Sequence, residues 1–125
     1  MNPDRVDKFK NFLISELKKD KFNIPKAAKA EAEKGLAWRK EFGRGGTDVG
    51  LNTARILTTS QTVGEEKVRH IAKYFPRHEV DKEAEGWSPG DKGFPSNGRI
   101  AWALWGGDPA WKWSQDIVER MDKKE

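Results

Sequence analysis

Five side chains that can carry charge occur within the six residues Arg77-His78-Glu79-Val80-Asp81-Lys82, among them histidine, both carboxylate types and lysine, which are common general acids and bases. A histidine beside two carboxylates can supply a general base with a positioned partner, and carboxylates two residues apart can hold a hard cation. However, the sequence contains no serine or cysteine nucleophile motif, no Walker loop and no dinucleotide fingerprint. An enzyme acting through His78, Glu79 and Asp81 is therefore the minor alternative, and a structural role for these charges is favoured.

The chain lacks cysteine, and His70 and His78 are its two histidines. Disulfide frameworks and Cys/His zinc sites need more of these ligands than the sequence provides. We therefore expect no metal and no cofactor. No apolar run approaches the roughly 20 residues that span a membrane, so no membrane partner is expected either.

Positive charge is concentrated in the N-terminal half of the chain. The net charge is +4, but residues 1–62 carry 13 Lys and Arg against 8 Asp and Glu, whereas residues 63–125 carry 11 against 12. Such a surplus favours polyanions such as nucleic acid, or an acidic protein face.

Two segments, 49–58 and 64–75, are predicted to form a pair like a helix-turn-helix. The second projects Lys67, Arg69 and Lys73 away from its apolar face, as a recognition helix requires. Glu65 and Glu66 at its N-terminal end would repel phosphate, so an ordinary helical hairpin stays an open alternative. The predicted nucleic-acid-binding residues are Arg44, Arg55, Lys67, Arg69, Lys73 and Arg77.

The six tryptophans are concentrated toward the C-terminus, with four of them between Trp102 and Trp113. Each buried indole removes a large apolar area from water, so most are expected in the core or anchoring a loop. Neighbouring tryptophans on a helix point in different directions, so at least one is expected at a partner surface or under the long loop. The residues proposed for these loop or partner-surface positions are His78, Trp87, Trp102 and Trp105.

Helical periodicity and capping signals predict the elements that position these residues. A first helix is expected up to about residue 19, and a second is expected after an Asn23 cap and ends at Gly43. Thr47 or Asp48 caps the third. The fourth follows a Gly64 cap, within a staple of Val63 and Val68, and is expected to stop at Pro76.

The C-terminal third combines a loop with two further helices. Residues 77–98 are rich in glycine and proline and form a long loop, pinned by Trp87 and Phe94. Ser96 caps a short helix, and Asp108-Pro109 is predicted to begin the last one. No segment alternates with period two. We therefore predict an all-α single domain of five or six helices: an accessory helix over residues 1–21, the domain over 22–121, and a charged tail over 122–125.

The sequence from Gly35 to Trp113 contains four motifs, namely GRGGT at 43–47, RHEVDK at 77–82, GWSPG at 86–90 and WALWGGD at 102–108. With these motifs it resembles a small uncharacterised domain that recurs in tailed-bacteriophage proteins, alone or attached to capsid-maturation and other head-region proteins. The resemblance implies a phage context and a shared fold, and it transfers no catalytic residue. Residues 1–21 lie outside it.

Two functions follow from these observations. The first is a small basic phage protein that binds nucleic acid, most simply DNA, through a cationic helical surface. The alternative is a protein-interaction module, either a minor virion or head-assembly component or an inhibitor of a host protein. Either would act in the cytoplasm of an infected cell or in the virion.

Overall fold

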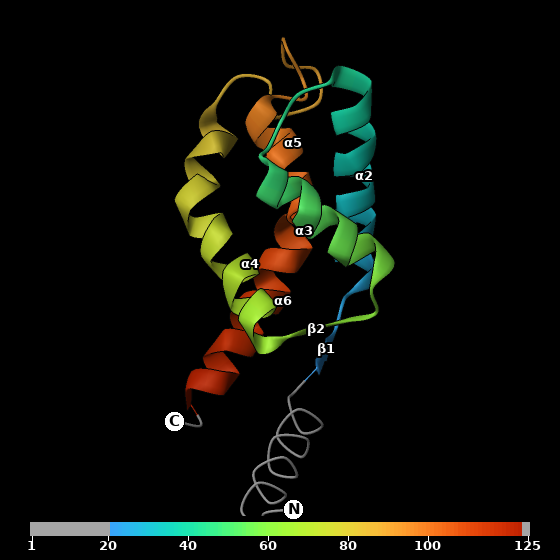
Figure 1. Ribbon diagram of the computed structural model, residues 1–125. Coiled ribbons are helices and arrows are strands. Elements are labelled where there is room, and N and C mark those ends of the chain that lie inside the picture. Colours follow the sequence, from blue (N-terminus) through green and yellow to red (C-terminus); the bar gives the residue numbers. More distant parts are fainter. Residues whose placement is uncertain (1–20, 124–125) are drawn as a thin grey trace, which may run out of the picture.

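Five α-helices and one 3₁₀ helix make up most of residues 21–123, the part of the chain that the computed structural model describes (Figure 1). The elements are β1 (Lys21–Asn23), α2 (Lys26–Phe42), α3 (Asp48–Thr59), β2 (Thr62–Gly64), α4 (Glu65–His78), η1 (Glu79–Glu83), α5 (Asn97–Leu104) and α6 (Gly107–Lys123). The predicted all-α class is confirmed. The helix predicted before residue 20 lies outside the described residues.

Local sequence signals set most of the helix ends. Gly43 ends α2 in the left-handed conformation, with φ of 64°, which glycine adopts without steric cost. The Thr47 side chain accepts a hydrogen bond from the Gly50 N–H at 3.3 Å and caps α3. Ser96 caps α5 by accepting from the Arg99 N–H at 3.1 Å. The predicted caps Gly43 and Ser96 are confirmed, and of the two alternatives predicted for α3, Thr47 and Asp48, the cap is Thr47.

The chain also contains two short strands, which the hydrophobic periodicity does not predict. β1 and β2 pair antiparallel, with Phe22 opposite Val63. Each strand has three residues, too few for an alternating pattern to stand out. Asn23 is consequently part of β1 rather than a helix cap, and α2 begins only after Pro25.

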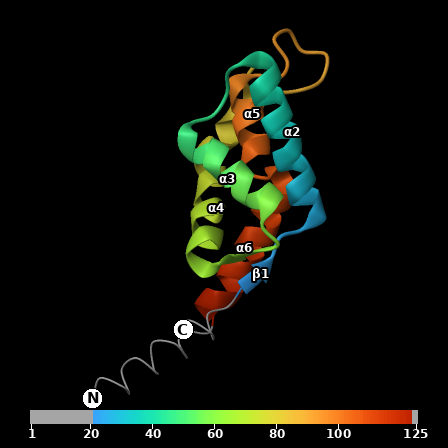
Figure 2. The same ribbon diagram turned by 45° about the vertical axis from the view of Figure 1, so that its right-hand side comes forward.

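The helices pack around a main core, and a smaller buried cluster of Val63, Val68 and Ile117 adjoins it. α2 packs on α5 and α3, and α4 packs on α6, which also contacts α2 (Figures 1 and 2). Gly35 lets the α5 backbone approach α2, because a Cβ there would lie 2.6 Å from the Leu104 nitrogen. The largest fully buried side chains, Trp102 and Phe75, lie in this core.

The long segment between α4 and α5 is anchored at several points, as predicted. It begins with η1, and the Trp87 ring meets the buried Trp102 ring edge to face at 5.4 Å. Farther along, Phe94 packs on Trp38 of α2 at 5.6 Å. The loop is therefore held on the core by aromatic contacts from both of its halves.

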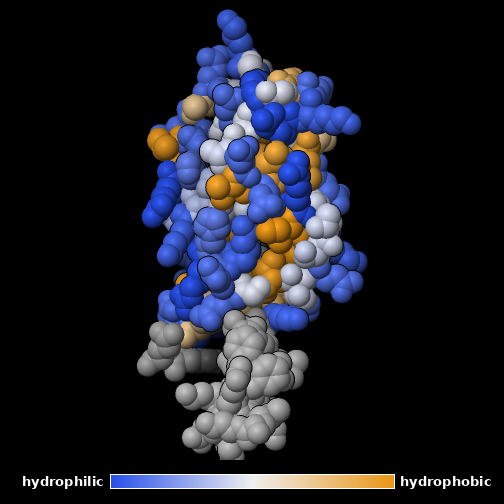
Figure 3. Space-filling view, in the orientation of Figure 1, coloured by the Kyte–Doolittle hydropathy of each residue, from blue (hydrophilic) through white to orange (hydrophobic). Residues whose placement is uncertain are grey.

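The surface is mainly hydrophilic. On the face seen in Figure 3, hydrophobic residues gather in a band near the middle. Within residues 21–123 the large apolar side chains that are most exposed are Phe42, Val49 and Val80, which belong to α2, α3 and η1. They come from three separate elements, so they do not define one interface by themselves.

Candidate functional site

Helix α4 positions the side chains of the candidate site. Val63 and Val68 are both buried in one cluster, so the predicted staple around Gly64 is confirmed. The predicted stop at Pro76 is wrong. The helix continues to His78 and leads directly into η1. A proline near the end of a helix removes one backbone hydrogen bond, to the carbonyl of Ala72, and the last turn tolerates this loss. Arg77 consequently stays in helical register with the rest of α4.

Arg69, Lys73 and Arg77 form a basic stripe along α4. Residues four apart on a helix are neighbours on its surface, so the three side chains follow one another along the same side. They border a groove of about 470 Å³ between α4 and α6. The other residues that line this α4–α6 groove are Ala72, Pro76, Trp111, Gln115, Val118 and Glu119.

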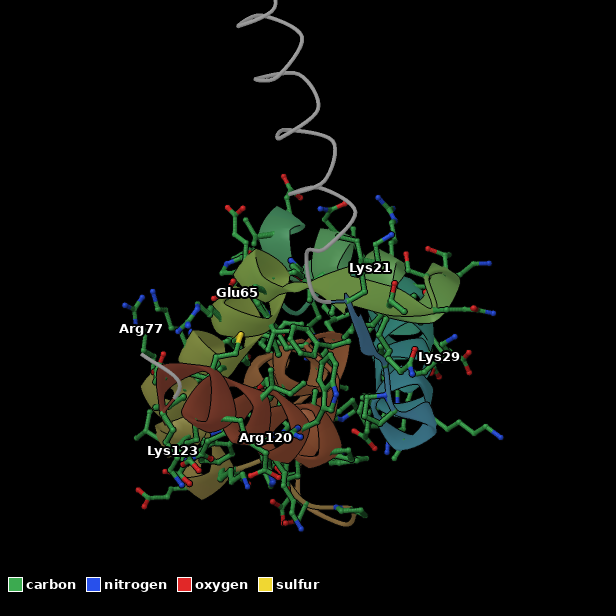
Figure 4. All side chains as sticks on the ribbon, turned by 90° about the horizontal axis from the view of Figure 1, so that it is seen from below. Lys21, Lys29, Glu65, Arg77, Arg120 and Lys123 are labelled. Atoms are coloured by element: carbon green, nitrogen blue, oxygen red, sulfur yellow. The ribbon has the colours of Figure 1, made fainter. Side chains whose placement is uncertain are left out.

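The remaining predicted cations lie elsewhere. Lys67 faces α3, where its ammonium group donates to the Thr53 hydroxyl at 2.8 Å. Arg44 follows α2 and donates to the Asn97 side chain at the start of α5 at 2.8 Å, and Arg55 is exposed on α3. Figure 4 shows that basic side chains surround the molecule, with Arg77 and Lys29 on opposite sides. The six predicted residues therefore do not share one surface, and three of them line the groove.

The charges along the stripe are unequal. Arg69 pairs with Asp122 at 3.0 Å and with Glu65 at 3.1 Å. These hydrogen bonds, to Asp122 first and then Glu65, raise the pKa of Arg69 above its ordinary value. Lys73 and Arg77 form no ion pair with any residue between 21 and 123. Asp122, predicted to begin a tail, belongs to α6.

Trp111 forms a rigid apolar wall of the groove. Its ring stacks on Phe75 with centroids 5.7 Å apart and meets the Trp102 ring edge to face at 5.6 Å. Trp111 is not among the residues predicted for the site, and neither are Gln115, Val118 and Glu119. Their positions on α6 carry no signal by themselves, because the groove exists only where α6 lies beside α4.

Two of the predicted partner-surface tryptophans are buried. Trp102 is 1% exposed, lies under Trp87 of the loop, and donates from its indole nitrogen to Asp108 at 2.9 Å. Trp105 is 6% exposed and stacks on Tyr74 at 4.5 Å, so its proposed loop or partner-surface position is wrong. Asp108 lies in the first turn of α6, which begins at Gly107, so it accepts a hydrogen bond from Trp102 of α5 and is not the cap of α6.

The acid–base side chains of residues 77–82 do not gather at one site. His78 Nδ1 lies 3.7 Å from Asp81, and its ring stacks on Tyr74 at 4.3 Å. Lys82 turns away to pair with Asp108 at 3.1 Å, while Glu79 is exposed. Among the described residues no group of three or more His, Cys, Asp or Glu could hold a metal ion. The catalytic alternative stays a prediction that this geometry does not favour.

His70 should give the protein an acid-sensitive stability. Partial burial, followed by the positive charges of Lys67 and Lys73, lowers the pKa of His70, and Glu66 offsets this in part. A histidine with a folded-state pKa below its unfolded value of about 6.5 favours folding above that pH, and this stabilisation is lost as the pH falls. We expect the melting temperature to fall between about pH 7.5 and 5. The melting temperature of the His70→Gln variant should fall less over the same pH range. His78→Gln is the matched control, and its melting temperature should fall as that of the wild type does. An equal fall in wild type and His70→Gln would contradict this assignment.

These features define a small helical domain with an apolar groove that is bordered by basic side chains on one helix. Comparisons of the chain with protein-family models, with curated proteins and with solved structures found no match. Between residues 21 and 123, no helix is both long and apolar enough to cross a membrane.

Proposed function

We propose that this protein is a protein-interaction module that binds an acidic, amphipathic helix of a partner in the α4–α6 groove. The observation that carries the proposal is the combination of an apolar groove of about 470 Å³ with a basic stripe along one of its borders. A helix laid in such a groove buries its apolar face and leaves its flanking side chains at the border.

Charge complementarity selects the acidic partner. Lys73 and Arg77 are exposed and have no ion-pair partner within residues 21–123, so carboxylates of a docked helix would meet uncompensated cations. Glu119 lies on the α6 side of the groove. The border is therefore basic along α4 and not along α6, which fixes the side on which the partner's acidic residues should lie.

The groove also offers an anchor of the kind that dominates binding energy. Trp and Arg are enriched among residues that contribute most to protein interfaces, and Trp111 is held in place by Phe75 and Trp102.

Binding to nucleic acid is the second candidate, and the stripe of Arg69, Lys73 and Arg77 is the observation that favours it. Two features weigh against it. Arg69 is already paired with two carboxylates, and the groove below the stripe is lined by apolar side chains and Glu119. A phosphate backbone gains little from an apolar surface and depends instead on several unpaired cations.

Reversing the charge of the stripe should weaken peptide binding. The ligand is a labelled helical peptide of about 16 residues, with leucines along one face and glutamates beside them. We expect Lys73→Glu combined with Arg77→Glu to raise its dissociation constant by roughly tenfold at low salt, because two exposed charge pairs are lost and each contributes up to about 1 kcal/mol. Fluorescence anisotropy measures the change.

Lys26→Glu combined with Lys40→Glu is the matched control, because it makes the same total charge change at two exposed positions of α2. A second peptide, with lysines in place of the glutamates, should bind at least tenfold more weakly to the wild type. Equal binding of both peptides would overturn the proposal. Displacement of the acidic peptide by duplex DNA, with a steep salt dependence, would favour the nucleic-acid candidate instead.

A phage context is part of the proposal and rests on the motif resemblance alone. In that setting the module would act in virion or head assembly, or would inhibit a host protein. Capture of an acidic helical partner from infected cells, lost in the Lys73→Glu, Arg77→Glu variant, would support this setting.

A further inference from the structure

A second hollow, of about 350 Å³, lies at the start of α4 and is lined by Gly64, Glu66, Lys67 and His70. None of these four residues lines the α4–α6 groove. Gly64 is exposed, and a Cβ placed on it would meet no described atom within 4 Å, so the space beside it is open. A small molecule can therefore reach the side chain of Lys67, which is half-buried.

The Lys67 amine has two hydrogen-bonding neighbours, and neither of them is a carboxylate. Its Nζ donates to the Thr53 hydroxyl at 2.8 Å and lies 3.4 Å from Nδ1 of His70. Thr53 is fully buried and donates its own hydrogen to the carbonyl of Val49 at 2.9 Å, so its oxygen is a fixed acceptor. Lys67 forms no ion pair with any residue between 21 and 123. Neutral acceptors favour an ammonium ion less than a carboxylate would, so these contacts hold the amine in place without fixing its charge.

The surroundings of Lys67 shift its amine toward the neutral form. Partial burial lowers the pKa of Lys67, because an ammonium ion loses hydration there. The Trp105 ring, which is 6% exposed, lies 5.6 Å from Nζ on one side. An indole face attracts an ammonium ion by about 0.5–1 kcal/mol at partly exposed sites, which offsets part of the effect of burial. A desolvated lysine without a carboxylate partner is the kind of lysine that acts as a nucleophile in proteins.

The number of acceptors leaves the reactive electron pair of the amine available. A neutral amine has two hydrogens and one lone pair. Thr53 accepts one hydrogen, and Nδ1 of His70 accepts the other when the ring hydrogen is on Nε2. The lone pair then points away from both acceptors. Because Lys67 borders the hollow, a carbonyl carbon in the hollow can approach this lone pair.

Size and charge select the ligand. A hollow of about 350 Å³ is near the lower end of the range for small-molecule sites, so it suits a small compound. The Glu66 carboxylate lines the hollow and would repel an anionic ligand such as a keto acid. An aldehyde carbon is less crowded than a ketone carbon and is therefore attacked more readily. These features favour a small, neutral aldehyde.

From this arrangement we propose that Lys67 binds small neutral aldehydes covalently and reversibly as an imine, independently of the partner proposed for the α4–α6 groove. Nζ attacks the carbonyl carbon, an N–C bond forms, and the carbonyl electron pair moves to oxygen. His70 passes a proton from the nitrogen to that oxygen. The resulting hydroxyl takes up another proton and leaves as water while the C=N bond forms, and the nitrogen then releases its second proton. The two amine hydrogens and the carbonyl oxygen thus account for the water, and nothing is oxidised or reduced.

The test is reductive trapping of the full chain with propanal and cyanoborohydride at neutral pH, followed by mass spectrometry of its peptides. Cyanoborohydride reduces each imine to a stable propyl amine, so the rate of trapping is measured separately at every lysine. Lys112, an exposed lysine of α6, is the comparison within the same sample. We expect trapping at Lys67 to be at least about fivefold faster than at Lys112, because a desolvated lysine is the stronger nucleophile at neutral pH. Equal rates at the two lysines would overturn the proposal.

A variant of His70 tests the proton transfer. The amide of His70→Gln can accept a hydrogen bond but cannot carry a proton, so the rate at Lys67 should fall at least about threefold while the rate at Lys112 stays the same. His78→Gln is the matched control and should leave both rates unchanged. A Lys67 rate that stays the same in His70→Gln, or falls only together with the Lys112 rate, would overturn the role of His70.

A second aldehyde tests the charge of the ligand. Glyoxylate carries a carboxylate, so repulsion by Glu66 should reduce the preference for Lys67 over Lys112 relative to that seen with propanal. Taking the ratio of the two lysines in each sample removes the difference in intrinsic reactivity between the two aldehydes. An equal or larger preference with glyoxylate would overturn the assignment to neutral aldehydes.

Discussion

Replacing Gly35 by alanine is expected to destabilise the protein, although alanine is the better residue in most helix interiors by about 1 kcal/mol. The added Cβ would lie 2.6 Å from the Leu104 nitrogen and 2.9 Å from the Ala103 carbonyl carbon. Both are backbone atoms of α5, so no side chain can turn aside, and the two helices must separate. Such overpacking costs about 1–3 kcal/mol, and we expect the melting temperature to fall by about 5–10 °C.

Ala37→Gly is the matched control for this prediction. Ala37 is exposed two residues further along α2, and removing its methyl group should cost about 1 kcal/mol through helix propensity alone. The same methyl group is thus unfavourable at residue 35 and favourable at residue 37. Thermal unfolding followed by circular dichroism compares the two variants. A Gly35→Ala protein as stable as the wild type would show that α2 and α5 do not approach as closely as described.

The sequence was informative where a structural choice depends on one or two neighbouring residues. Gly43 and Ser96 are predicted helix ends, and Thr47 is one of the two residues predicted to cap α3; each acts through its own backbone freedom or side-chain hydrogen bond. The Val63–Val68 staple belongs to the same class. These interactions connect residues close in sequence, so the pattern contains all the information that is needed.

Predictions failed where a residue's role depends on a distant segment. Asn23 is a good helix cap by type, but it follows Phe22, which pairs with Val63 some forty residues later. Asp108 is likewise a good cap, but Trp102 and Lys82 use its carboxylate instead. In both cases a tertiary contact overrides the local preference, as the weak energies of such preferences allow.

The candidate groove shows the same limit. Arg69, Lys73 and Arg77 were selected from their charge on one helix, and the structure brings them together on it. Trp111 and Val118, which make the groove apolar, come from α6 and could be selected only once its packing against α4 was known. Arg77 belongs to the stripe because α4 continues past Pro76, which the sequence signal for a helix stop did not predict.

Helix α4 thus contributes one face to the core and another face to the α4–α6 groove. Its buried face packs Val68, Ile71 and Phe75 into the core, and Phe75 in turn supports the Trp111 ring beside the groove. Ala72, between these faces, is the residue whose small side chain keeps the α4 side of the groove open. Filling the groove at that position separates the role of its shape from the role of its charge.

Ala72→Trp is accordingly expected to raise the dissociation constant of the acidic amphipathic peptide by more than about 100-fold. The variant leaves every basic side chain in place. Ala72 is half-buried and lines the groove, so an indole there should occupy the space that the partner's apolar side chains need. Isothermal titration calorimetry measures the loss, and a thermal melt shows that the domain still folds.

Ala27→Trp, at an exposed position of α2, adds the same side chain outside the groove and should leave peptide binding unchanged. The comparison also separates the two candidate functions, because a ligand attracted by charge alone does not need the apolar cavity. Duplex DNA that binds Ala72→Trp and the wild type equally well, in a salt-dependent manner, would identify the stripe as a phosphate-binding surface. If the acidic peptide binds Ala72→Trp and the wild type equally well, the peptide site lies outside the α4–α6 groove.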